Sequence, residues 1–258
     1  MYADENNDSR VFTRENIDMY LFELAKEYRK LAGINTPAEV ILVGGAAVIT
    51  LYRFREDTTD IDAVIQAASA IKEAIAHVEE KCHLPYGWIN TDFQKTTSYS
   101  RNLVRCSSYY RTFCQILSVR VVKAEYLIAM KLRAFRQYKH DVSDIVGILI
   151  AHEEKGDAIT IERIDHAMAE LYGSWDGVSP EAVDYIKERI GRHDYMDLFE
   201  ETQKSEKEMK EDLMKIERDY PDLLSNNSIG QIVEGLRKRK SKGAKDSVLD
   251  QTDRRNPE

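Results

Sequence analysis

The sequence is poor in the residues that hold disulfide-rich domains and zinc sites together. It has three cysteines, an odd number with no CxxC spacing, which argues against a disulfide framework and a zinc knuckle. Its six histidines form no HExxH pair, which argues against a zinc enzyme. We therefore expect Cys82, Cys106 and Cys114 to be reduced and mostly buried.

Long apolar runs are also missing. No run approaches the roughly 18 apolar residues that a membrane helix requires. The first ten residues, MYADENNDSR, lack the basic start and apolar centre of a signal peptide. We expect a soluble, cytoplasmic protein with no membrane partner. Its 258 residues, 43% of them hydrophobic, are enough for one sizeable core and a second, smaller unit.

Charge is distributed unevenly along the chain. The formal net charge of −8 argues against nucleic-acid binding, but residues 93–140 contain ten basic residues and one acidic residue, for a local charge of +9. This basic segment suits a polyanion such as a triphosphate or RNA, and its tyrosines are suited to stack on bases. A solvated hairpin face or a surface for an acidic protein is the alternative. The ten basic residues are Lys95, Arg101, Arg105, Arg111, Arg120, Lys123, Lys131, Arg133, Arg136 and Lys139.

The hydrophobic pattern predicts a mixed domain followed by helices. Apolar residues at helical spacing predict a first helix that Thr13 caps and Gly33 ends. Beyond residue 155 the pattern is helical throughout. The other predicted elements are the strand 40–43, the helix 46–54, the strand 60–65, the helix 67–81, two or three strands within 102–122, and the helices 125–138 and 141–151. We predict a first domain over 1–151, a helical domain over 152–222 and a flexible charged tail over 223–258.

The stretch VILVGGAAVITLYRFREDTTDIDAVI, residues 40–65, places two carboxylates in apolar surroundings. Asp60 and Asp62 are two residues apart in a predicted strand, so their side chains share one face. Such a pair is suited to Mg²⁺ (or Mn²⁺), which is normally held by one or two carboxylates together with substrate phosphates. Gly44 and Gly45, where a strand becomes a helix, let backbone amides approach a phosphate closely. Taken singly, the glycine pair is commonly only a tight turn, and D-x-D is commonly a loop or a cap.

Three charged residues further along the chain are weaker candidates. Lys131 interrupts an apolar helical stripe, and it either snorkels to the surface or reaches the site and neutralises phosphate charge. Asp141 and Asp144 lie at the start of the next predicted helix, where D-x-x-D is also explained by capping and by the helix dipole. Both interpretations of each residue remain open at this point.

In this order the motifs VGGAAVITLYRFREDTTDID, LPYGWIN and KLRAFRQYKHDVSDI resemble the minimal nucleotidyltransferase superfamily. More narrowly, they resemble the AbiEii-type nucleotidyltransferase toxins. The similarity covers roughly residues 12–150. The glycine pair and D-x-D of the family fall on Gly44, Gly45, Asp60 and Asp62, its helical lysine on Lys131, and its Arg-Asp-x-x-Asp segment on His140, Asp141 and Asp144. A histidine therefore stands where an arginine is usual.

The resemblance implies an α+β nucleotidyltransferase fold, with a short mixed sheet flanked by helices and a helical C-terminal domain. It implies transfer of a nucleoside monophosphate from a nucleoside triphosphate (NTP) to an RNA such as tRNA, or to a protein, and a cognate antitoxin as partner. Asp141 or Asp144 would position Lys131 or the acceptor. The implied metal ligands are Asp60 and Asp62, and the implied nucleotide-binding residues are Gly44, Gly45, Thr59 and Lys131.

One departure from the family pattern concerns a third carboxylate, which many nucleotidyltransferases place on a neighbouring strand as general base and second metal ligand. The matching strand, QILSVRVV at 115–122, contains no acid. Either Asp92 or Glu125 substitutes, or two carboxylates suffice, or the protein is a noncatalytic nucleotide-binding or interaction protein. A small-molecule nucleotidyltransferase of the antibiotic-modifying kind is a further alternative, but it would need an acidic pocket, and the basic segment argues against that.

Overall fold

The computed structural model describes residues 11–192, 194–220 and 229–236. The chain divides into two compact units. The described part of the first unit is 11–135, 141–192 and 194–199, and the second unit contains 136–140 and the described residues from 200 onward. Most of the predicted tail, 223–258, lies outside the described residues.

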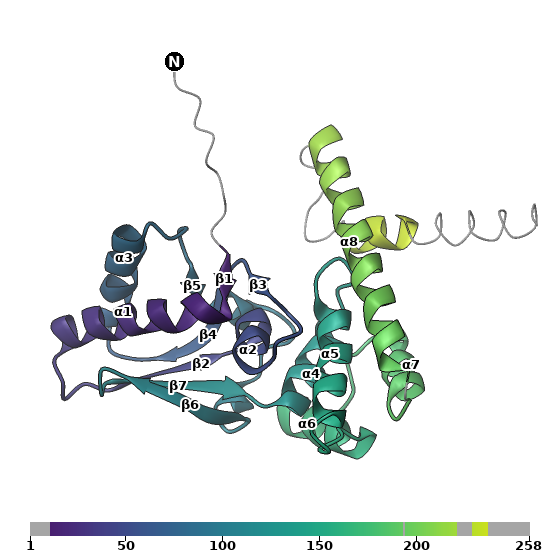
Figure 1. Cartoon of the computed structure of the whole chain (residues 1–258), viewed down its shortest axis with the longest axis horizontal. Helices are drawn as coiled ribbons and strands as arrows, with labels where there is room; N and C mark the ends of the chain where they lie inside the picture. The colour runs from purple at the N-terminus through teal and green to yellow at the C-terminus, as the bar shows by residue number, and fades with distance from the viewer. Residues whose placement is uncertain (1–10, 193, 221–228, 237–258) are drawn as a thin grey trace, which may run out of the picture. The chain divides into compact units, whose positions relative to one another are not determined.

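A five-stranded mixed sheet forms the centre of the first unit (Figure 1). Its strand order is β5-β4-β2-β7-β6, and β2 pairs antiparallel with β4 and parallel with β7. β6 pairs antiparallel with β7, while β5 runs parallel to β4. The strands are β2 (Ala38–Leu42), β4 (Ile61–Gln66), β5 (Ile89–Asn90), β6 (Ser107–Phe113) and β7 (Leu117–Val122), and a separate pair joins β1 (Phe12–Thr13) to β3 (Asp57–Thr58).

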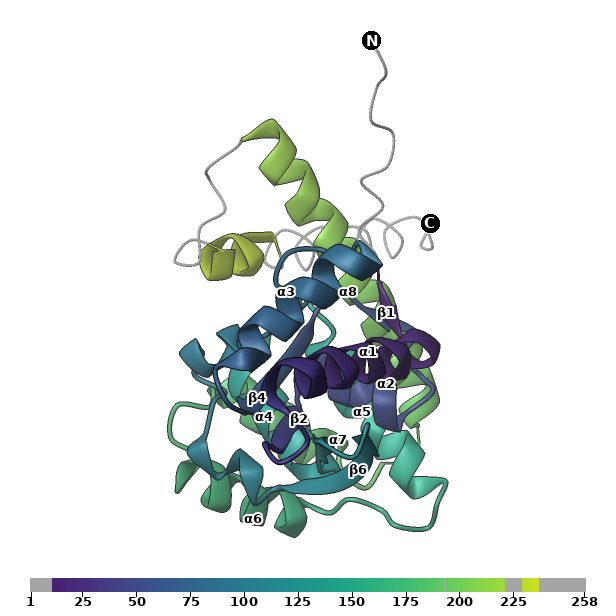
Figure 2. The same cartoon turned by 90° about the vertical axis from the view of Figure 1, so that its left-hand side faces the viewer.

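Helices α1 (Arg14–Ala32) and α3 (Ala70–Cys82) pack together on one face of this sheet (Figures 1 and 2). As predicted, α1 starts after Thr13, whose amide donates to Asn16 Oδ1 at 2.9 Å, and it ends at Gly33, which has a φ of 77°. The apolar stripe of α1 faces the core, and Leu24 and Tyr28 are fully buried there.

Helix α2 (Gly44–Leu51) follows β2 directly and is buried on all sides. The run Ala46–Ile49 is 0% exposed, as expected for a short helix that is apolar all round. The helix ends where Tyr52 takes an extended conformation, and residues 53–56 then lead into β3. Because β2 and β3 lie at its two ends, α2 holds the Gly44-Gly45 corner and the segment that follows Tyr52 in fixed positions.

The remaining helices of the first unit pack beside the C-terminal end of β7 (Figure 1). The helix α4 packs against the next three helices of the chain. Thr160 and Ser179 cap the second and third of these through their side chains, and α4 itself ends where Phe135 takes a left-handed conformation with φ 39°. The helices are α4 (Ala124–Ala134), α5 (Asp141–Glu153), α6 (Ile161–Tyr172), α7 (Pro180–Arg189) and the first residues of α8 (Tyr195–Asp219), and two 3-10 turns, η1 (Asp92–Lys95) and η2 (Arg101–Val104), precede β6.

The structure confirms the α+β class with a mixed sheet flanked by helices. Every helix and strand predicted within 13–151 is present, with ends that differ by a few residues, and all three cysteines are free. The predicted boundary at 151 and 152 falls within α5, and the first unit continues to residue 199. None of the helices among the described residues carries an apolar stretch long enough to cross a bilayer.

The second unit has a small core of its own. Met209 and Leu213 of α8 pack with Val233, and Tyr138 contacts the same cluster. In its described part this unit contains the rest of α8, a helical segment at 229–236 and the turn 136–140.

Gly147 of α5 provides a test of packing in the first unit. A Cβ at this position would lie 2.5 Å from Cδ2 and Cε2 of the Phe54 ring. We expect Gly147→Ala to lower the free energy of unfolding by about 1–3 kcal/mol through overpacking. In a Phe54→Ala background the same change should raise it by up to about 1 kcal/mol, because alanine is the better helix former. Urea unfolding of the four proteins checks this, and an equal effect in both backgrounds would contradict the contact.

Candidate functional site

The two carboxylates of the D-x-D lie at the end of the sheet where β4 begins. Asp60 directly precedes β4 and Asp62 is its second residue, and both are half-buried. The carbonyl of Asp62 accepts the amide of Val43 at 3.0 Å, which fixes β4 beside the end of β2. Gly44 has a φ of 54°, and a Cβ there would lie 3.4 Å from Asp62 Oδ2. The Asp62 carboxylate therefore lies against the first residue of α2.

The N-terminus of α2 is suited to bind an anion. Its N-cap residue, Val43, makes no capping hydrogen bond through its side chain, and the first turn contains no acid. The first amides of the helix and the helix dipole favour a negative group at this end. The α2 N-terminus and the Asp62 carboxylate thus meet at Gly44.

The second glycine has a packing reason as well. A Cβ at Gly45 would lie 2.5 Å from Thr58 Oγ1 and 2.8 Å from Arg55 Nη2. The Arg55 guanidinium therefore lies directly against the start of α2. Close backbone approach to a ligand is not needed to explain this glycine, since the arginine already requires it.

Arg55 belongs to a buried cluster of two cations and two carboxylates. Arg55 Nη1 and Lys131 Nζ both lie 2.6 Å from Asp144 Oδ2, and Lys131 Nζ also lies 3.4 Å from Asp141 Oδ1. Lys131 is 6% exposed and Asp144 is 1% exposed, so Lys131 does not snorkel to the surface. Burying these charges is tolerable only because each is paired.

Arg55 is a site residue that no sequence pattern indicates. It is anchored on both sides, since Nε donates to the Asp57 carbonyl at 2.8 Å and Nη2 lies 3.5 Å from Thr58 Oγ1. The neighbouring Thr59, predicted to bind nucleotide, is exposed. His140 belongs to the second unit, where its Nδ1 lies 3.8 Å from Glu206 Oε2. The structure thus brings Gly44, Gly45, Asp62, Arg55, Asp144, Lys131 and Asp141 into one continuous series of contacts.

Neither candidate for a third carboxylate forms a metal-binding group with Asp60 and Asp62 in the described part of the chain. Asp92 is exposed and pairs with Lys95 at 2.7 Å, while Glu125 pairs with Arg163 at 3.2 Å. In the part of the chain that the structure describes, no three His, Cys, Asp or Glu side chains form a group that could hold a metal ion. Two carboxylates next to a helix N-terminus still fit Mg²⁺, which normally completes its coordination with water and substrate phosphates.

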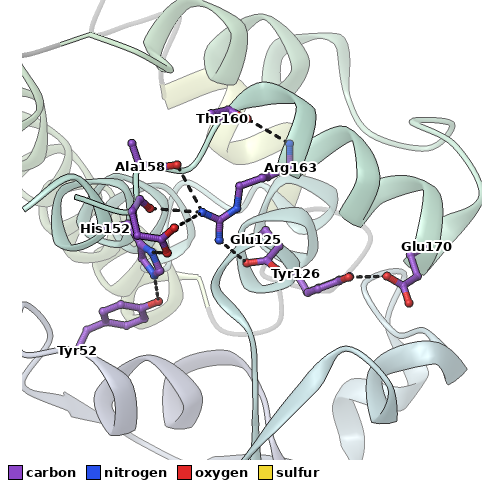
Figure 3. Close-up of polar contacts among 9 residues, drawn as sticks. Tyr52, Glu125, Tyr126, His152, Ala158, Thr160, Arg163 and Glu170 are labelled. Atoms are coloured by element: carbon purple, nitrogen blue, oxygen red, sulfur yellow. Dashed lines mark hydrogen bonds and ion pairs between the residues drawn. The ribbon is translucent and has the colours of Figure 1, made fainter. Parts of the chain in front are cut away.

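A second polar network stabilises the helices behind this site (Figure 3). Tyr52 Oη lies 3.1 Å from His152 Nε2, His152 Nδ1 lies 3.0 Å from Asp157 Oδ2, and Arg163 bridges Asp157 to Glu125. Hydrogen bonding from His152, with the nearby Arg163, lowers the pKa of Asp157, whereas burial raises the pKa of Tyr52. An ionised Asp157 accepts from Nδ1–H, which leaves Nε2 to accept from Tyr52. The network joins the end of α2 to α4, α5 and α6.

Several basic side chains of the segment 93–140 are already engaged in tertiary contacts. Arg111 pairs with Asp18 at 2.7 Å, Arg120 bonds to Ser107 within the sheet, and Arg133 donates to backbone carbonyls. Among the described residues, no carboxylate lies within ion-pair distance of Arg101, Arg105 or Lys123. The positive surface is therefore smaller than the sequence count indicates.

Two of these unpaired cations flank Cys106 at the end of the sheet that carries Gly44. The Lys123 amide donates to the Cys106 carbonyl at 3.1 Å, and Arg105 precedes Cys106 in the chain. Burial raises the pKa of the Cys106 thiol to about 11, so this cysteine is protonated and is not a nucleophile at neutral pH. Because Leu42 pairs with Val121 in the sheet, Lys123 follows β7 at the level where Gly44 follows β2. We call Arg105 and Lys123 the basic corner.

The family follows from a comparison of the sequence with family models. Residues 19–172, more than half of the chain, match the model described as Nucleotidyltransferase of unknown function (DUF6036). The chain belongs to this family. The matched residues contain the candidate site of this nucleotidyltransferase-like domain, from Gly44 to Asp144. No curated protein and no solved structure matches the chain. The narrower AbiEii-type resemblance stays a prediction, as do the roles of the individual site residues.

The shared carboxylate of Asp144 gives a stability prediction. Asp144→Ala leaves two buried cations short of a partner and should lower the free energy of unfolding by about 3–5 kcal/mol. Lys131→Met should cost less, because Asp144 keeps Arg55 at 2.6 Å. Urea unfolding of both variants measures the difference. A larger loss in Lys131→Met would show that Arg55 does not satisfy the carboxylate on its own.

Proposed function

We propose that the first unit transfers a nucleoside monophosphate from an NTP to an RNA acceptor. The observation that carries the proposal is the series of contacts at the α2 N-terminus, in which Gly44 touches Asp62 and Gly45 touches Arg55. Membership of a nucleotidyltransferase family supports it. In the reaction an acceptor oxygen forms a bond to the α-phosphorus, the bond to the β-phosphate breaks and pyrophosphate leaves, while the acceptor proton is lost to water.

In this proposal the residues of the chain mainly bind and orient the triphosphate. The first amides of α2 bind phosphate oxygens, and Arg55 lies beside them. The Lys131 ammonium has three donors, and contacts to Asp141 and Asp144 leave one for a phosphate. Asp141 and Asp144 are therefore positioning residues. Asp60 and Asp62 would hold Mg²⁺ or Mn²⁺, which when bound screens the charge that develops on the phosphates.

The basic corner supports RNA as the acceptor. Arg105 and Lys123 are exposed cations at the sheet end that carries Gly44, where they suit a phosphate backbone and oppose a cationic small molecule. A protein acceptor is an alternative outcome of the transfer experiment below.

A noncatalytic nucleotide-binding protein is the second candidate. The absence of a third carboxylate favours this candidate. Asp92 pairs with Lys95 and Glu125 pairs with Arg163, and among the described residues no third acid forms a metal-binding group with Asp60 and Asp62. Such a protein would bind NTP with magnesium and transfer nothing.

We also propose that the protein is the toxin of a bacterial toxin–antitoxin or phage-defence pair, on the strength of the AbiEii-type resemblance. Expression should then arrest growth, and a neighbouring gene product should relieve the arrest. Arrest that persists in Asp60→Asn with Asp62→Asn would separate toxicity from nucleotidyl transfer.

The transfer reaction is tested with each α-labelled NTP, magnesium and total bacterial RNA. Label should enter RNA with the native protein and fall by at least about 100-fold in Asp60→Asn with Asp62→Asn or when magnesium is chelated. Asp92→Asn is the matched control, since this exposed carboxylate pairs only with Lys95 among the described residues. Label in protein would change the acceptor. Magnesium-dependent NTP binding without any transfer would favour the noncatalytic candidate.

The acceptor assignment is tested by removing the basic corner. Lys123→Ser with Arg105→Gln should lower RNA labelling about tenfold at moderate salt and flatten its salt dependence, because two phosphate contacts are lost. Serine is a favourable N-cap for α4, so the fold should be retained. The control is the rate at which NTP is hydrolysed to pyrophosphate in the absence of RNA, with water as the acceptor, and this rate should not change. Unaltered RNA labelling would place the acceptor elsewhere.

A further inference from the structure

A pocket of about 440 Å³ lies at the other end of α2, away from the Gly44-Gly45 corner. It is formed where the segment after α2 meets α5 and the first turn of α8, all within the first unit. An eight-residue helix is about 12 Å long, so this pocket and the α2 N-terminus are separate places. Its volume falls in the range of small-molecule sites.

One wall of the pocket is aromatic and well fixed. The Phe54 ring stacks on the Tyr52 ring, with 5.4 Å between the two centroids. The Phe199 ring meets Phe54 edge-on, with 5.7 Å between the centroids. Tyr52 is held by His152 (Figure 3), and Phe54 lies against Gly147. A wall whose rings are held by packing and hydrogen bonds is preorganised for a flat apolar ligand.

Positive side chains line the same pocket. Arg14, Arg53 and Lys155 contribute three cations against one carboxylate, Glu154. Within the described residues, neither Arg14 nor Arg53 forms an ion pair. The Lys155 ammonium lies over the Tyr52 ring, 5.6 Å from the ring centroid. Three cations without a partnering acid leave the pocket with an excess of positive charge, which favours an anionic ligand.

We propose that this pocket binds a small planar aromatic acid. The aromatic ring packs against Phe54 and Phe199, and the acidic group, a carboxylate or a phosphate, pairs with Arg53 and Lys155. This proposal does not depend on the transfer reaction, because none of the pocket residues belongs to the site at the α2 N-terminus.

The test uses two probes that share this chemistry but differ in the acidic group. Indole-3-carboxylate and adenosine monophosphate are titrated into the full chain by calorimetry in magnesium-free buffer with chelator, and indole and adenosine serve as uncharged controls. Both acids, or one of them, should bind with one-to-one stoichiometry and at least about tenfold more tightly than the matched neutral compound. The acid that binds identifies the source as an aromatic carboxylate or a nucleotide.

Two variants locate the binding. Arg53→Ala with Lys155→Ala removes exposed charges only and should weaken binding about tenfold. Met196→Trp should block the pocket from a position that is 58% exposed, where a larger side chain does not disturb the core. Asp60→Asn with Asp62→Asn is the control and should bind the probe as the native protein does. Absence of saturable binding by either acid overturns the proposal, and so does binding that only the Asp60 and Asp62 control removes.

Discussion

The Asp144 carboxylate, shared by Arg55 and Lys131 at 2.6 Å each, is the interaction on which the candidate site depends. Buried charges are stable only in pairs, so the loop after α2, the helix α4 and the helix α5 must meet at this one oxygen. The contact fixes α5 against α2, and through Gly45 it fixes Arg55 beside the first amides of α2. The geometry at the N-terminus of α2, where we propose that phosphate binds, therefore depends on an ion cluster that is itself electrically balanced.

This constraint also accounts for two glycines that lie far apart in the sequence. Arg55 excludes a side chain at Gly45, and the ring of its neighbour Phe54 excludes one at Gly147. Two adjacent residues of one loop are thus held against the start of α2 and the middle of α5. The same loop contributes the wall of the aromatic pocket on one side and the cation of the ion cluster on the other. A substitution that displaces Phe54 is expected to displace Arg55 as well, because a single peptide bond joins the two residues.

The sequence predicted those parts of the site that leave a local pattern. Asp60 and Asp62 stand out because carboxylates are costly in an apolar strand, and Lys131 because it interrupts an apolar stripe. Arg55 leaves no such pattern, since it lies in a polar loop and its partner Asp144 is 89 residues away. For the same reason, a local count of charge overestimates the positive charge that the basic segment exposes. Arg111 is neutralised by Asp18, which lies 93 residues earlier in the chain.

The balance of charge at the site bears on the missing third carboxylate. The charges of Arg55 and Lys131 are balanced by those of Asp141 and Asp144, and Asp60 and Asp62 add two further carboxylates at the end of the sheet that carries Gly44. A divalent cation would neutralise that pair and leave no positive charge to attract a triphosphate. The attraction must then come from the α2 N-terminus and the basic corner, since Arg120, the charged residue of β7, bonds to Ser107. A third carboxylate on β7 would add negative charge with no further cation to balance it, so a two-carboxylate arrangement is consistent with the electrostatics of this fold.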